Sequence, residues 1–195
     1  MEKMRLFTAF PVSPEASLHL TDAQEHMRTE NAGRMIRWVD PASFHVTVHF
    51  LGDVDTGQVD TVKSILSYVG ERSAPFDVSL SRLDTFPHPS APNTILCHVT
   101  DETGMGKSLE AAAGDRLHLH RLLKERRVWR PHITLGRVKD GKPVNGLPRI
   151  PISPLHWTVR ELQLFSSDLS GSSPVYMLVQ SFPLSYGTDD PRRAH

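Results

Sequence analysis

Three features are scarce in this chain: cysteine, long apolar runs and net charge. Cys97 is the single cysteine of 195 residues, so no internal disulfide can form, which fits a reducing compartment. No apolar run approaches the roughly 20 residues of a membrane span, and the apolar stretch in MEKMRLFTAF is too short for a signal peptide. We therefore expect a cytoplasmic protein that does not associate with a membrane.

Basic and acidic residues balance at 22 each, which gives a formal net charge of zero. That balance argues against a protein that coats long nucleic acid through a large basic surface. It leaves room for a small phosphate site, because a few arginines suffice for one phosphate. The 11 histidines are the compositional surplus, and composition alone allows solvent-facing residues, metal ligands or acid–base groups.

Apolar spacing, prolines and glycines predict a chain in which strands and helices are mixed. Ser13 and Pro14 fit the start of a helix, and a capping box of Thr21 and Gln24 is the alternative start. We expect a single domain over residues 1–185 and a polar tail over 186–195. The expected strands are 4–10, 35–40, 43–52, 76–86, 94–99, 131–138, 155–167 and 174–184, and the expected helices are 13–33, 59–69 and 105–124.

The tripeptide His-x-Thr recurs more often than composition explains. With 11 histidines and 13 threonines, chance predicts about 0.7 occurrences, and the sequence has five. They begin at His19, His45, His98, His132 and His156. His19 lies in an expected helix, and the other four lie in expected strands, where residues i and i+2 project from the same face. The tripeptide alone is therefore a weak signal, and a polar strand face explains His98 and His156 well.

Context distinguishes His45 and His132. Each follows a proline-containing segment, each strand runs on to a glycine, and the two histidines are 87 residues apart, after one long helix each. This order suggests a duplicated unit, although no clear sequence repeat proves it. On an even alternation His49 shares the face of His45, but about 13 Å along an extended strand, which is too far for a third catalytic group.

The stretches SFHVTVHFLG and RPHITLGRV resemble the paired His-x-Thr motifs of the two-histidine phosphoesterase superfamily. The resemblance is greatest to its RNA 2′,3′-cyclic phosphodiesterase branch, once called 2′-5′ RNA ligases. It extends over roughly residues 4–184, through RLFTAFPVSPE, RWVDPASFHVTVHFLGDV and ELQLFSSDLSGSSPVYMLVQSFPL. It implies an α+β fold of two lobes related by a pseudo-twofold, in which two antiparallel sheets face a central cleft and the helices lie outside.

The same resemblance implies the chemistry. Opening a cyclic phosphate by in-line attack needs a base and an acid on opposite sides of phosphorus, and histidine suits both tasks. The resemblance makes His45 the proton donor and His132 the proton acceptor, although pseudo-symmetry leaves these roles exchangeable. Thr47 and Thr134 would hold the phosphate with Arg137, without a metal or cofactor.

Arginine placement leaves two candidates open for the phosphate. Regular alternation turns Arg137 to the face opposite His132, unless a bulge near Gly136 redirects it. Arg130, two residues before His132, is the candidate on strand geometry alone. Three aromatic residues could stack on a base, but core packing is the favoured role of each. They are Phe7, Trp38 and Phe86.

The expected substrate is an RNA with a 2′,3′-cyclic phosphate end or a cyclic nucleotide, hydrolysed to a 2′-phosphomonoester by a monomer with no obligate protein partner. Three alternatives stay open. The first is the reverse chemistry, 2′-5′ RNA ligation. The second is a non-catalytic module that binds RNA ends. The third is a metal-dependent hydrolase, which the absence of any His-Glu-x-x-His, His-x-His-x-Asp or cysteine-pair motif disfavours.

Overall fold

A computed structural model describes residues 2–125, 127–147, 152–171 and 174–186. These residues contain nine strands: β1 (Lys3–Pro11), β2 (Ile36–Trp38), β3 (His45–Asp55), β4 (Phe76–Phe86), β5 (Thr94–Asp101), β6 (His132–Val138), β7 (His156–Val159), β8 (Glu161–Asp168) and β9 (Val175–Pro183). The helices are α1 (Pro14–Glu30), α2 (Val59–Glu71) and α3 (Met105–Leu119), with short 3-10 helices at Pro41–Ser43 and Thr56–Gln58. The chain is therefore α+β, as expected.

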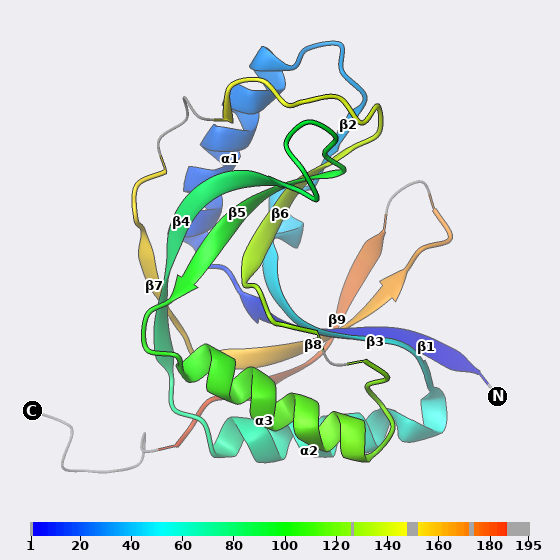
Figure 1. The fold of residues 1–195 in the computed structure, drawn as a ribbon. Helices are drawn as coiled ribbons and strands as arrows, with labels where there is room; N and C mark the ends of the chain where they lie inside the picture. The colour runs from blue at the N-terminus through cyan, green and yellow to red at the C-terminus, as the bar shows by residue number, and fades with distance from the viewer. Residues whose placement is uncertain (1, 126, 148–151, 172–173, 187–195) are drawn as a thin grey trace, which may run out of the picture.

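All nine strands belong to one strongly curled antiparallel sheet, in the order β7-β4-β5-β6-β3-β1-β8-β9 with β2 beside β6 (Figure 1). The expectation of two separate sheets is corrected here, because β3 and β6 join the two halves through the pair Val46–Ile133. We call β7-β4-β5-β6-β2 the first half of the sheet and β3-β1-β8-β9 the second half. Both members of the joining pair are buried, so the junction is part of the apolar core.

The helices cross between the halves of the sheet. α1 follows β1 of the second half, yet its buried Gln24 donates to the carbonyl oxygens of Val39 (2.7 Å) and of Leu135 in β6 (2.9 Å). α3 follows β5 of the first half and lies beside α2 under the second half (Figure 1). Two antiparallel strand pairs are therefore separated in the chain by a helix: β1 and β3 by α1, with β2 also between them, and β5 and β6 by α3.

Local signals explain where α1 begins and ends. The Ser13 hydroxyl accepts a hydrogen bond from the amide of Ala16 at 3.1 Å, and Pro14 occupies the first helical position. Thr21 lies inside the helix and donates to the Ser17 carbonyl, so the alternative start at a Thr21–Gln24 capping box is wrong. At the other end the Asn31 side chain donates to the Met27 carbonyl at 2.8 Å.

The largest differences from the expected boundaries concern α3 and the segment 155–167. α3 ends at Leu119 and does not reach 124, and Arg121 beyond it has a positive φ of 59°. The segment expected as one strand over 155–167 divides at Arg160 into β7 and β8, which pair with β4 and with β1 and β9 respectively. The division at Arg160 arises because the pairing of each half with a different strand overrides a local apolar pattern. Most of the expected tail, residues 187–195, lies outside the described residues.

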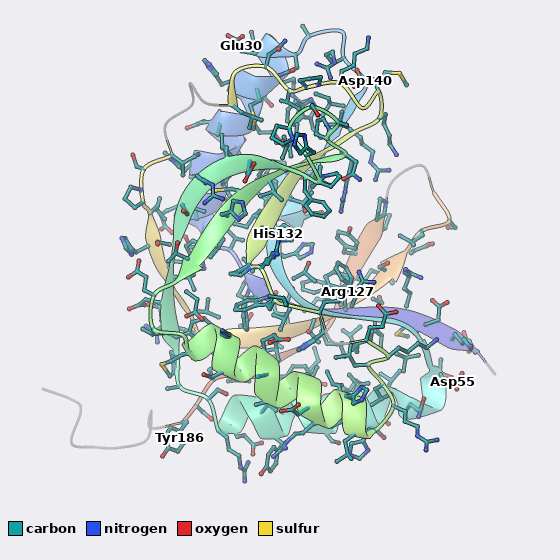
Figure 2. The ribbon with its side chains drawn as sticks, viewed as in Figure 1. Glu30, Asp55, Arg127, His132, Asp140 and Tyr186 are labelled. Atoms are coloured by element: carbon teal, nitrogen blue, oxygen red, sulfur yellow. The ribbon has the colours of Figure 1, made fainter. Side chains whose placement is uncertain are left out.

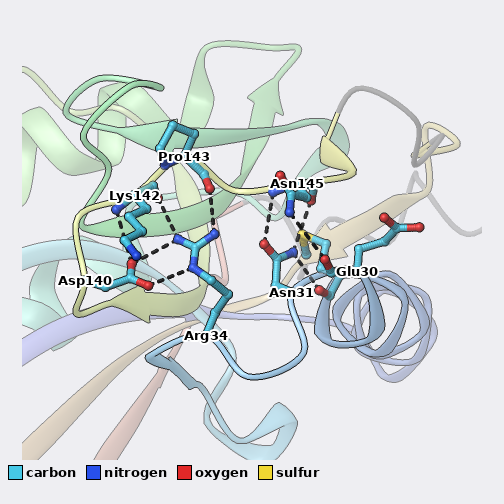
Figure 3. Close-up of polar contacts among 8 residues, drawn as sticks. Glu30, Asn31, Arg34, Asp140, Lys142, Pro143 and Asn145 are labelled. Carbon is cyan, nitrogen blue, oxygen red and sulfur yellow. Dashed lines mark hydrogen bonds and ion pairs between the residues drawn. The ribbon is translucent and has the colours of Figure 1, made fainter.

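A polar cluster holds the segment after β6 against the end of α1 (Figure 3). The Arg34 guanidinium forms a two-point bond with the Asp140 carboxylate at 2.7 and 2.9 Å and also donates to the carbonyls of Lys142 and Pro143. These bonds keep the pKa of the Asp140 carboxyl far below its usual range. The described part of the chain contains no helix with the length and apolarity of a membrane span.

Candidate active site

The two expected motifs meet at the junction of the sheet. Val46 and Ile133 are Cα partners in antiparallel strands, and directly opposite residues of such a pair share a face. Extending the register by one residue each way puts four polar side chains on the face opposite this buried pair. They form the cross-strand pairs His45–Thr134 and Thr47–His132. In a regular pair the diagonal neighbours, here the two histidines, lie about 7–8 Å apart.

Both imidazole rings are fixed in the same way. The Nδ1 of His45 lies 2.7 Å from the carbonyl oxygen of Ser43, and the Nδ1 of His132 lies 2.7 Å from the carbonyl oxygen of Arg130. A carbonyl oxygen can only accept, so Nδ1 carries the proton in each ring. The Nε2 atoms are left to exchange a proton with a substrate. Figure 2 shows His132 near the middle of the molecule, between the two halves of the sheet.

Burial lowers the pKa of both histidines below the ordinary value of 6.5. The bonds from Nδ1 to the backbone carbonyls act in the opposite direction but do not cancel the desolvation. Neighbouring positive charge lowers each pKa further: His132 acts on His45, and His98 and Arg137 act on His132. Neutral rings are therefore favoured in the free protein, and the bound anion that the chemistry requires would favour the protonated form of one of them.

A β-bulge brings Arg137 to the face of the two motifs. Thr134 pairs with Leu96, but Gly136 pairs with Ile95, so one extra residue, Leu135, interrupts the alternation of β6. Arg137 consequently shares the face of Thr134, and its Nη1 donates to the Thr94 hydroxyl of β5 at 2.7 Å. The bulge near Gly136, on which a role for Arg137 depended, is present.

Arg130 lies outside the regular strand. β6 begins at His132, so the alternation that favoured the Arg130 side chain does not extend to it. Its carbonyl oxygen holds the His132 ring, and its side chain is exposed. In the described contacts the backbone carbonyl of Arg130 reaches His132, and its guanidinium does not.

His49 does not share the face of His45, and that sequence-based interpretation is wrong. Thr47 pairs with Ala9 and His49 pairs with Thr8, so Val48 is an extra residue that reverses the alternation of β3. His49 is buried, and its Nε2 lies 3.1 Å from the Glu110 carboxylate of α3. It therefore ties α3 to β3 from the far side of the sheet.

An aromatic cluster surrounds the His45 ring on the strands of the second half of the sheet. Phe7, Tyr176 and Phe165 have ring centroids 5.1, 5.5 and 6.3 Å from that of His45. Phe7 also stacks on Phe165 at 5.2 Å and lies 6.2 Å from Phe50, which is 71% exposed. The reversal at Val48 places Phe50 opposite Phe7 on this face. The cluster gives His45 an apolar wall.

Only part of this cluster was expected from sequence. Phe7 is in it, but Trp38 packs over Gly136 with the Arg28 guanidinium 5.6 Å from its ring, and Phe86 is an exposed residue at the end of β4. Phe165 and Tyr176 were missed. Only the pairing of β8 with β1 and with β9 brings them to His45, and no local sequence signal shows that pairing.

Among the described residues there is no group of three or more His, Cys, Asp or Glu side chains with the geometry of a metal site. His156, which has its own His-x-Thr, lies on β7 and pairs with Glu102 at 3.2 Å. The polar groups of the site are thus two histidines, two threonines and an arginine on one face of the sheet.

Two facing His-x-Thr strands on a curled antiparallel sheet are the arrangement that the resemblance to two-histidine phosphoesterases predicts. The family model described as LigT-like phosphoesterase matches residues 10–97, which include the first motif. The RNA 2′,3′-cyclic phosphodiesterase of Aquifex aeolicus is 27% identical over 94% of this chain and 99% of its own length. That of Geobacillus stearothermophilus is 28% identical over 98% of this chain, which spans 60% of that longer relative. Over these ranges the chain is similar to LigT-like phosphoesterases.

Solved structures agree with this fold. A protein of Thermus thermophilus is 27% identical, covers 93% of this chain and 98% of its own, and superposes with a TM-score of 0.78. The match to Escherichia coli LigT in complex with 3′-AMP covers 94% of this chain and 99% of LigT, with a TM-score of 0.74. At 18% identity it supports the fold alone.

Proposed function

We propose that this chain hydrolyses 2′,3′-cyclic phosphodiester ends of RNA to 2′-phosphomonoesters. The observation that carries the proposal is the pair His45 and His132, on one face of the sheet, each with Nδ1 fixed on a carbonyl and Nε2 left for a substrate. Relatives aligned over nearly the whole chain carry the name RNA 2′,3′-cyclic phosphodiesterase. Both halves of the curled sheet would then face a cleft that holds the RNA end.

The reaction follows from in-line displacement at phosphorus. The Nε2 of His132 takes a proton from water as the water oxygen forms a bond to phosphorus. The bond from phosphorus to the 3′ oxygen breaks on the opposite side, and the Nε2 of His45 gives its proton to that oxygen. After the reaction His132 has gained a proton and His45 has lost one. Proton exchange with solvent restores both rings to their starting states.

The remaining polar groups stabilise the phosphate. The hydroxyls of Thr47 and Thr134 donate to non-bridging oxygens, and Arg137 supplies positive charge from the same face. Arg130 is a second cation for the phosphate, and its exposed position suits the more distant RNA backbone. The aromatic wall formed by Phe7, Phe165 and Tyr176 beside His45 suits the sugar and base of the terminal nucleotide.

The test is incubation of an RNA that ends in a 2′,3′-cyclic phosphate, in ¹⁸O-labelled water with a strong chelator. Hydrolysis gives a 2′-phosphate that carries one ¹⁸O atom, and the rate is unchanged when Mg²⁺ replaces the chelator. A 2′-5′ linked product with an added 5′-hydroxyl RNA would indicate the reverse chemistry. Binding without any product would indicate a non-catalytic RNA-end module, and loss of activity with the chelator would indicate a metal-dependent hydrolase.

A further inference from the structure

A third histidine lies directly beside the candidate general base. His98 of β5 and His132 of β6 are Cα partners in antiparallel strands, so their side chains leave the same face of the sheet. In a regular pair the Cβ atoms of such partners lie about 4.5–5.5 Å apart. A polar strand face, the sequence-based interpretation of His98, is therefore an incomplete explanation of this residue.

A β-bulge of β4 lies opposite His98. Leu80 pairs with Val99 and Leu83 pairs with Cys97, so two residues of β4, Ser81 and Arg82, oppose the single residue His98. Bulges of this kind bend a strand and re-aim its side chains, and they are frequent beside active sites. Here the bend lets two charged side chains of β4 reach one imidazole.

The first of them is Asp84. Its Oδ2 lies 3.0 Å from the Nε2 of His98, and both side chains are about one-third exposed, at 35% and 29%. Burial raises the pKa of the Asp84 carboxyl, but the bonds from His98 and from the Thr85 amide outweigh it, and the net pKa is lowered. A carboxylate only accepts, so the Nε2 of His98 carries a proton.

The second is Arg82, whose Nη2 lies 3.4 Å from Asp84 Oδ2 and 3.5 Å from His98 Nε2. Because Nε2 already donates to Asp84, Arg82 acts on this ring as a neighbouring charge. Asp84 and Arg82 from β4 and His132 from β6 are thus the charged and titratable groups that face His98 among the described contacts.

The surroundings of His132 are equally defined. His98 faces it from β5, His45 lies diagonally across on β3, and Arg137 shares its face on β6. No acidic group appears among the charges that act on His132 in the described residues. The Asp84 carboxylate of β4 is bonded to His98 instead.

We propose that the Asp84–His98 pair is a positioning element of the active site, which keeps His132 unprotonated so that it can accept the proton of the attacking water. Asp84 fixes the ring of His98, and His98 lies beside His132, where positive charge on its ring lowers the pKa of His132. Neither residue touches the reacting atoms. The inference rests on the proposed function, because His132 accepts a proton only in that reaction.

The pH titration of the His132 ring, followed by NMR without substrate, tests this inference independently of activity. The His132 signal is assigned by its loss in His132→Gln. In His98→Gln the amide keeps a donor for Asp84 but cannot carry the positive charge that lowers the pKa of His132, so the His132 midpoint rises by roughly half a pH unit to one unit. The matched control is His156→Gln, a strand histidine with its own acidic partner Glu102, which leaves the midpoint unchanged.

A smaller replacement, His98→Asn, must move the midpoint in the same direction, which guards against a variant that folds poorly. In Asp84→Asn the ¹⁵N spectrum of His98 changes from the Nε2–H tautomer to a mixture of tautomers. A His132 midpoint that does not move in His98→Gln, or that moves equally in His156→Gln, would overturn the proposal. So would an Nδ1–H tautomer of His98 in the unaltered protein. An inactive protein with the expected titration would instead overturn the proposed function, and the effect of His98 on the His132 midpoint would remain.

Discussion

Val46 and Ile133 are the Cα partners that join β3 to β6, and both side chains are buried, with 2% and 0% exposure. The pair does two things at once. It closes the two halves of the sheet into one, and it sets the register that brings the two His-x-Thr motifs onto one face. The core of this protein and its candidate site therefore depend on the same two residues.

Truncation of a side chain of this pair should lower both the stability of the core and the activity of the candidate site. Ile133→Ala leaves a cavity in the core and lowers the free energy of unfolding by about 2–5 kcal/mol, whereas Ile133→Val costs about 0.5–1.5 kcal/mol. Turnover per folded molecule falls with Ile133→Ala, because the motif strands lose their fixed register. Denaturant unfolding and initial rates measure the two effects. Full turnover in the folded fraction of Ile133→Ala would contradict this role of the junction.

Arg137 is held by the Thr94 hydroxyl at 2.7 Å, which predicts a second effect. Thr94→Val removes the acceptor and keeps the size of the side chain, so the guanidinium loses its fixed position. We expect kcat/KM for a 2′,3′-cyclic nucleotide to fall by roughly 10- to 150-fold, in line with about 1.5–3 kcal/mol for a hydrogen bond to a charged group. Thr94→Ser, which keeps the hydroxyl, is the control. Equal rates in Thr94→Val and Thr94→Ser would contradict the prediction.

The lowered pKa values of His45 and His132 predict how stability depends on pH. In the unfolded chain these rings take up protons near 6.5, and in the folded protein they do so at lower pH. The unfolded state therefore binds more protons as pH falls below 6.5, and the free energy of unfolding decreases in that range. The double variant His45→Gln/His132→Gln should lose less stability between pH 7 and pH 5 than the unaltered protein. If the double variant lost as much stability between pH 7 and pH 5 as the control variant His156→Gln, the two rings would not be buried and neutral.

The Arg34–Asp140 cluster predicts a local effect on the segment after β6 (Figure 3). Asp140→Asn removes the charge of a two-point bond and weakens the hold of Arg34 on the segment 140–147. Limited proteolysis should cleave this segment faster in Asp140→Asn. Asp53→Asn, which removes a more exposed partner at 3.4 Å from Arg5, serves as the control. Equal cleavage of the two variants would show that the cluster does not anchor the segment.

Local chemistry made some of this structure predictable from sequence. Ser13 and Pro14 fix the start of α1, and the alternation of apolar residues locates β4 and β5 within a few residues. The pairing of His45 with His132 came from a resemblance, since five His-x-Thr tripeptides share the same local pattern. The faces of His45 and His132, each shared with the threonine two residues later, also follow from alternation.

What failed was alternation across bulges. One extra residue at Val48 turns His49 away from the site, and one at Leu135 turns Arg137 toward it. Neither bulge is visible in sequence, because each exists only relative to the partner strand. For the same reason the neighbours of the site that come from distant strands were not found: Phe165 and Tyr176 beside His45, and Asp84 with His98 beside His132.

The most direct test of the account is turnover of an RNA with a 2′,3′-cyclic phosphate end by His45→Ala, by His132→Ala and by the double variant. Positioned acid and base groups each contribute about 10²–10⁴ in rate, so each single variant should lose at least about a hundredfold in kcat. His156→Ala, which alters a His-x-Thr histidine on β7, should turn over at the unaltered rate. Wild-type turnover in either His45→Ala or His132→Ala would contradict catalysis by paired histidines.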